Sequence, residues 1–121
     1  MVTEPDETQA HGYQAEDSTL GGYARVHRRP PAFEGWDGHP YTVSIETEKV
    51  ADLKAPIGGY LVFPRWAHNG VGVIGHVESP LLWRGSTVTA VEEAAGDTPL
   101  ARVQEILNEA IALAAEAGRE D

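Results

Sequence analysis

The chain has 121 residues, with 19 acidic against 9 basic side chains, a formal net charge of −10 at pH 7 and no cysteine. This length fits one domain with a single core. The absence of cysteine excludes disulfides, cysteine-ligated metals and thiol chemistry. The negative charge argues against nucleic acid and anionic membranes as partners, because both are bound by basic surfaces.

The acidic charge gathers at the ends of the chain. Residues 1–21 contain five acids, no base and no apolar periodicity, so we expect a disordered acidic tail. This segment does not read as a secretory signal, and no run reaches the ~20 apolar residues of a membrane helix. We therefore expect a cytoplasmic protein with a single α+β domain over residues 22–118, followed by a short C-terminal end at 119–121.

A first strand is predicted from Tyr23 to about Arg28, where two prolines remove backbone donors. A turn region rich in glycine follows. Residues 41–47 then alternate between apolar and polar side chains, which is typical of a strand with one wet face. The core face of this strand is predicted to hold Tyr41, Val43 and Ile45.

Asn69 and Gly70 lie between two runs of strand-forming residues, and Asn-Gly is a strong signal for a hairpin with a two-residue loop. In that register Trp66 faces Val73. One face of the hairpin is then apolar: Tyr60, Val62, Trp66, Val73 and Val77. We expect this face to join the core.

The other face of the hairpin is mixed in character. It combines three apolar with three polar residues: Leu61, Phe63, Ile74, Arg65, His76 and Glu78. If the helices cover only the apolar face, this mixed face is exposed. Folded proteins rarely leave a large contiguous apolar patch open to water, so the mixed face is predicted to be an interface.

Two helices are predicted at the C-terminal end. Thr89 and Glu92 fit a capping box that starts a short helix ending near Gly96. Thr98 is predicted to cap a second helix, whose apolar residues follow an i, i+3, i+4, i+7 pattern as far as Gly118. The predicted fold is therefore α+β, with a three- to four-stranded antiparallel sheet and both helices packed on one of its faces.

Residues 70–75 match G-x-G-x-x-G, but the following residues favour a strand and not the helix that a dinucleotide site requires. No nucleophile elbow or Walker loop is present. The five histidines lack a compact metal-binding spacing. We therefore expect no cofactor and no metal.

Two functions remain open from the sequence. The first is a small non-catalytic interaction or accessory domain that forms a homodimer, or docks on a protein partner, through the mixed face. The alternative is a small-ligand or catalytic site on the same face, with Arg65, His76 and Glu78 as its polar groups. Trp36 and His39, in a loop before the second strand, would then form a lid.

Overall fold

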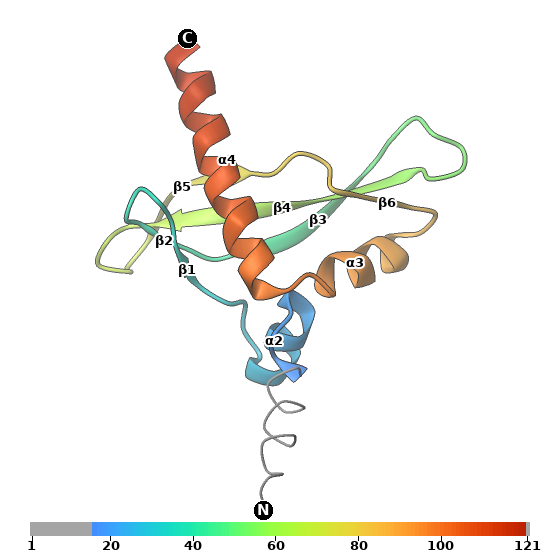
Figure 1. Cartoon of the computed structure of the whole chain (residues 1–121), viewed down its shortest axis with the longest axis horizontal. Coiled ribbons are helices and arrows are strands. Elements are labelled where there is room, and N and C mark those ends of the chain that lie inside the picture. Colours follow the sequence, from blue (N-terminus) through green and yellow to red (C-terminus); the bar gives the residue numbers. More distant parts are fainter. Residues whose placement is uncertain (1–15, 121) are drawn as a thin grey trace, which may run out of the picture.

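The computed structural model describes residues 16–120, and this part of the chain is α+β (Figure 1). It contains three helices: α2 (Leu20–His27), α3 (Val88–Gly96) and α4 (Leu100–Glu120). It contains six strands in one antiparallel sheet: β1 (Phe33–Glu34), β2 (Pro40–Tyr41), β3 (Ser44–Lys49), β4 (Ile57–Trp66), β5 (Val73–Glu78) and β6 (Trp83–Gly85). The predicted class and the antiparallel sheet are confirmed, whereas the numbers of strands and helices are larger than expected.

The long strand β4 is the centre of the sheet. It pairs with β2 and β3 along one edge and with β5 and β6 along the other, and β1 adds to β2. Tyr41 of β2 lies opposite Arg65, and Ser44 of β3 lies opposite Val62, so β2 and β3 keep one register along β4. The sheet has more strands than predicted because each edge of β4 pairs with two short strands, β2 and β3 on one side and β5 and β6 on the other.

The predicted first strand is instead helix α2. The side chain of Thr19 caps this helix by accepting the N–H of Gly22 at 3.0 Å, and Arg28 ends it in the left-handed region with φ 59°. Leu20 is only 4% exposed and belongs to the core. Residues 16–21 of the predicted tail are therefore part of the fold, and the remainder of that prediction lies outside the described residues.

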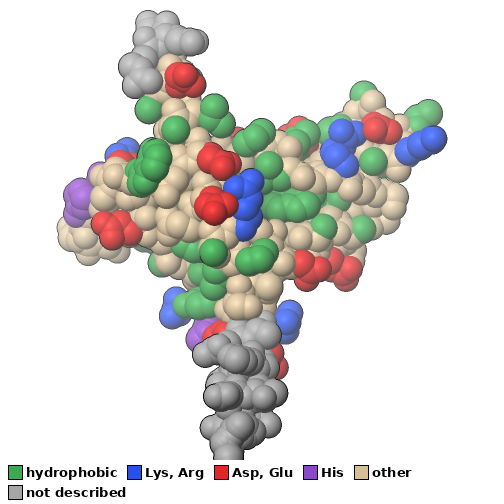
Figure 2. Space-filling view, viewed as in Figure 1, with side chains coloured by type: hydrophobic (Ala, Val, Ile, Leu, Met, Phe, Trp, Pro, Cys, Tyr) green, Lys and Arg blue, Asp and Glu red, His purple; other side chains and the backbone are tan. Residues whose placement is uncertain are grey.

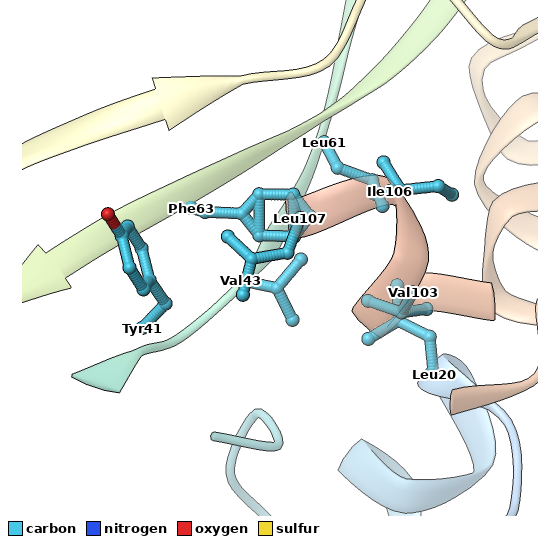
Figure 3. Packing of buried hydrophobic residues seen from close by; sticks show 8 residues of the cluster. All are labelled: Leu20, Tyr41, Val43, Leu61, Phe63, Val103, Ile106 and Leu107. Carbon is cyan, nitrogen blue, oxygen red and sulfur yellow. The ribbon is translucent and has the colours of Figure 1, made fainter. Parts of the chain in front are cut away.

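The core lies on one face of the sheet, where side chains of β4 and its neighbours meet the helices (Figure 3). It contains Leu20, Tyr41, Val43, Leu61, Phe63, Val103, Ile106 and Leu107, with Ile45 packed against it. Helix α4 crosses this face (Figure 1), and the surface on this side of the molecule mixes acidic, basic and apolar side chains (Figure 2). Helix α3 covers the same face, because Val91 packs closely on Gly59 and Gly85. The predicted core face of the 41–47 strand is confirmed.

The predicted exposure of Leu61 and Phe63 is wrong, because both side chains are 0% exposed. The pairing of β3 with β4 explains the difference. Ile45 lies opposite Leu61, so the core-facing side of β3 continues onto the odd-numbered residues of β4. The helices therefore cover the face that was predicted to be open.

A β-bulge changes the second half of the hairpin. Trp66 faces Val73 as predicted, but Arg65 faces Gly75, which leaves Ile74 as the extra residue. Beyond the bulge the register is shifted by one residue, so that Val77 lies opposite Phe63 and packs against the core.

The hairpin loop is longer than predicted, because the N–H of Ala67 donates to the carbonyl of Gly72. Asn69 and Gly70 lie inside this loop. Only Gly70 has a positive φ, of 74°, so the two-residue type I′ loop is not formed.

Both C-terminal helices begin at positions other than those predicted. The side chain of Thr87, not Thr89, caps α3 by accepting the N–H of Ala90 at 3.0 Å. In α4 the first helical hydrogen bonds go to the carbonyl of Pro99, not to that of Thr98. Among the described residues, no helix combines the length and the apolar character that a membrane crossing requires.

Candidate functional site: the open face of the sheet

The face of the sheet opposite the helices carries the even-numbered residues of β4, since alternate residues of a strand point to opposite faces. Within the described part of the chain, all three helices pack on the other face. We use the name open face for nine residues of β3, β4 and β5: Ser44, Glu46, Glu48, Tyr60, Val62, Pro64, Trp66, His76 and Glu78.

The centre of the open face is a row of apolar side chains along β4: Tyr60, Val62, Pro64 and Trp66, all half-buried. The indole of Trp66 is held in place, because its Nε1–H donates to Thr42 Oγ1 at 3.0 Å. At the opposite end Leu81 packs over Gly58. The row is therefore a continuous strip of apolar surface that ends at Trp66 on one side and at Leu81 on the other.

Acidic side chains border this row on both sides. Glu46 of β3 lies directly opposite Tyr60, and Glu78 of β5 lies directly opposite Val62. A depression of about 190 Å³ lies between the two borders, lined by Glu48, Tyr60, Glu78, Ser79 and Leu81. Partial burial, together with the charges of Glu78, Glu48 and Glu46, raises the pKa of Tyr60. The carboxylates of Glu46, Glu48 and Glu78 would favour a cationic group at the open face.

His76 and Glu78 remain together on the open face, as predicted. His76 Nε2 lies 3.2 Å from Glu78 Oε2, and both side chains are more than half exposed. An exposed pair of this kind contributes little to stability. It can therefore rearrange at low cost when a partner approaches.

Arg65 does not join His76 and Glu78, because it lies on the opposite face of β4. Its Nη2 forms an ion pair with Asp37 Oδ2 at 3.1 Å. Asp37 Oδ2 also accepts the hydroxyl of Tyr41 at 2.7 Å. The three polar groups of the predicted ligand or catalytic site are thus not brought together.

The environment of Asp37 shows a structural role for this cluster. Burial opposes ionisation of Asp37, but the hydrogen bonds from Tyr41 and the His39 N–H, together with the charge of Arg65, outweigh it and lower its pKa. Burial and the neighbouring Asp37 raise the pKa of Tyr41. These groups form a network that joins the turn before β2 to the end of β4.

The predicted lid residues, Trp36 and His39, have different partners. Trp36 is 77% exposed and lies on the helix side, where its backbone N–H donates to Asn108 Oδ1 of α4 at 3.1 Å. His39 Nδ1 lies 3.1 Å from the carbonyl of Trp66, and the His39 ring stacks on His68 with centroids 4.0 Å apart. Trp36 therefore does not cover the open face.

Sequence reasoning placed Tyr60, Val62 and Trp66 of this row in the core, together with Val73, so it missed them as surface residues; Val73 is 54% exposed. Of the apolar residues predicted for the interface, Ile74 alone is exposed, at 53%, on the bulge beside the open face. The two acidic borders were the available signal, because a strand face lined by glutamates on each neighbour is expected to meet water.

Within residues 16–120, no three histidine, aspartate or glutamate side chains lie close enough to hold a metal ion. Comparisons with protein-family models, curated protein sequences and solved structures found no match for the chain.

Proposed function

We propose that this chain is a non-catalytic protein-interaction domain that docks a partner protein on its open face. One observation carries the proposal. The described helices cover a single face of the sheet, and the other face presents an apolar row bordered by carboxylates. Contiguous apolar surface with a polar rim is the usual anatomy of an interface.

The residues of the row suit this role. Tyrosine and tryptophan are enriched among the side chains that contribute most to binding, and Tyr60 and Trp66 mark the two ends of the row. Both sit on the central strand of the sheet, which limits the conformational entropy lost on binding. The hydrogen bond from Trp66 to Thr42 further fixes one of them before a partner arrives.

The acidic borders specify the chemistry of the partner. Glu46 and Glu48 lie along one side and Glu78 along the other, so a complementary surface has an apolar centre with lysine or arginine at its rim. A second copy of this chain would bring carboxylates against carboxylates, which is unfavourable. We therefore favour a different, basic protein over self-association through this face.

Site-specific photocrosslinking tests the proposal. A photoreactive phenylalanine analogue is placed at Val62 in the centre of the open face, and at Ala101 on the exposed side of α4 as the matched control. Both proteins are expressed in the cells that normally make the chain, irradiated, and analysed by mass spectrometry. We expect a discrete crosslinked species from position 62, with a basic contact surface, and none from position 101.

Equal crosslinking from both positions, or none from position 62, would contradict the proposal. A crosslink from position 62 to another copy of the chain would contradict the choice of partner. Light scattering at micromolar concentration separates these cases, since the proposal expects a monomer in the absence of the partner.

A further inference from the structure

A second surface lies at the free edge of β3, on the helix side of the sheet. A groove of about 450 Å³ separates this edge from α2 and from the segment that leads to β1. Its lining is mostly apolar, with two arginines: Leu20, Gly21, Ala24, Arg28, Arg29, Pro30, Pro31, Val43, Ser44 and Ile45. It shares Ser44 with the open face, but its other lining residues lie outside that face.

The edge of β3 is unpaired for a physical reason. β1 covers the neighbouring edge only as far as the pair Phe33 and Tyr41. Continuing that ladder backwards would place Pro31 beside Val43 and Pro30 beside Ser44, and proline has no N–H to donate. The chain diverges at this point instead, and the groove lies between the two segments.

The backbone groups that face the groove can be assigned from the ladder. The N–H of Thr42 donates to the carbonyl of Pro64, so the even-numbered residues of this strand bond to β4. The N–H and C=O groups of Ile45 and Thr47 therefore point away from β4. Among the described residues, none supplies a backbone partner to them.

Positive charge lies at one end of the groove. Arg28 and Arg29 line it, and neither makes an ion pair within the described part of the chain. Arg28 holds a left-handed backbone conformation, with φ 59°, that is uncommon for a residue other than glycine. These two arginines are a local exception in a chain of net charge −10.

We propose that the edge of β3 binds an extended acidic segment of a partner protein as an added strand. Its backbone pairs with Ile45 and Thr47, an apolar side chain enters the groove beside Leu20, and a carboxylate binds Arg28 and Arg29. Addition of a strand to an exposed edge is a common mode of peptide recognition. A second copy fits less well, because pairing of two β3 strands around Thr47 would place Glu46 opposite Glu48.

The experiment uses the full chain and a defined probe. The probe is a fluorescent eight-residue peptide with two aspartates followed by alternating valine and threonine, and the control peptide carries two lysines in their place. Fluorescence anisotropy measures affinity for the wild-type chain, for the double variant Arg28→Glu with Arg29→Glu, and for Lys54→Glu as the matched control. Amide hydrogen exchange of the wild-type chain is measured with and without the peptide.

We expect saturable binding of the acidic peptide, weakened about tenfold or more by the double variant and less than about twofold by Lys54→Glu. Exchange of the Ile45 and Thr47 amides slows on binding. Val62→Lys on the open face leaves this affinity unchanged, so the two proposals fail separately. The proposal would be overturned if the acidic peptide showed no saturable binding, or if the lysine peptide bound with equal affinity. Unchanged amide exchange, or a dimer whose β3 amides are already protected, would overturn it as well.

Discussion

Asp37 and Arg65 form an ion pair of 3.1 Å that joins the turn before β2 to the end of β4. The hydroxyl of Tyr41 donates to the same carboxylate at 2.7 Å. Alternation along β4 places Arg65 on the helix side although its sequence neighbours Pro64 and Trp66 are on the open face, and the network holds its side chain there. It gives the arginine a structural role and leaves the acidic borders of the open face without a local basic partner from β4.

The stability provided by Asp37 should depend on pH. Its pKa is lower in the folded protein than the ordinary value of 3.8. The carboxylate therefore stabilises the fold fully above about pH 4, and this contribution is lost as the pH falls through the lower folded-state pKa. Urea unfolding of the wild type and of Asp37→Asn, at several pH values from 7 to 2.5, measures it. At pH 7 the variant should be about 1–3 kcal/mol less stable.

The difference in unfolding free energy between the two proteins should shrink as the solution becomes more acidic than pH 4. A difference that stays constant over the whole range would show that ionisation of Asp37 does not stabilise the fold. A difference that grows in acid would show that folding raises the pKa of Asp37 instead of lowering it.

The assignment of the two sheet faces predicts unequal effects of neighbouring substitutions. Phe63→Ala removes a side chain that is 0% exposed and leaves a cavity under α4, so it should cost about 3–5 kcal/mol of unfolding free energy. Val62→Ala, one residue away on the open face, should cost less than about 1 kcal/mol, because water already reaches that side chain. Urea unfolding of both variants measures the contrast. Similar losses would mean that both faces are covered.

The start of α3 can be tested with two threonines. Thr87→Ala removes the oxygen that accepts the N–H of Ala90 at 3.0 Å, so it should cost about 1 kcal/mol. Thr89→Ala changes an exposed residue inside the helix, where alanine is the better helix former, so it should be neutral or slightly stabilising. Thermal unfolding of both variants distinguishes them. The opposite order of melting temperatures would place the cap at Thr89.

The packing of α3 on the sheet depends on Gly59. A Cβ at this position would clash with Val91 Cγ1, so Gly59→Ala should push α3 away from β4 and cost about 1–3 kcal/mol. Gly72→Ala is the matched control, since a Cβ there meets nothing within 4 Å. Equal melting temperatures for the two variants would contradict the close contact.

The parts of the fold that could be predicted from the sequence rest on local signals. The alternation around Tyr41 and Val43 identified a core-facing strand, and the 3.6-residue periodicity identified α4. Helix α2 was missed because its only strong signal is the cap at Thr19, which is followed by two glycines that are poor helix formers.

The apolar centre of the candidate site could not be predicted from β4 alone, because it depends on pairings between distant segments. Which face of β4 is buried follows from the register that places Ile45 opposite Leu61. The alternation within β4 alone fits either face. The bulge at Ile74 then shifts the pairing of β5 with β4 by one residue, so that Glu78 and not Val77 lies opposite Val62. A shift of one residue is enough to move a side chain to the other face.

Docking on the open face is tested most directly by calorimetry, which measures the affinity of the partner for this chain. The partner is the protein crosslinked from position 62, and the chain carries either Val62→Lys or, as the matched control on α4, Leu113→Lys. Leu113 is 51% exposed and lies outside the open face. Both variants should keep the wild-type melting temperature within a few degrees. We predict that Val62→Lys raises the Kd about tenfold or more, because a charge is buried in the centre of the interface, and that Leu113→Lys changes it less than about twofold. A Val62→Lys protein that binds as tightly as the wild type would contradict the account.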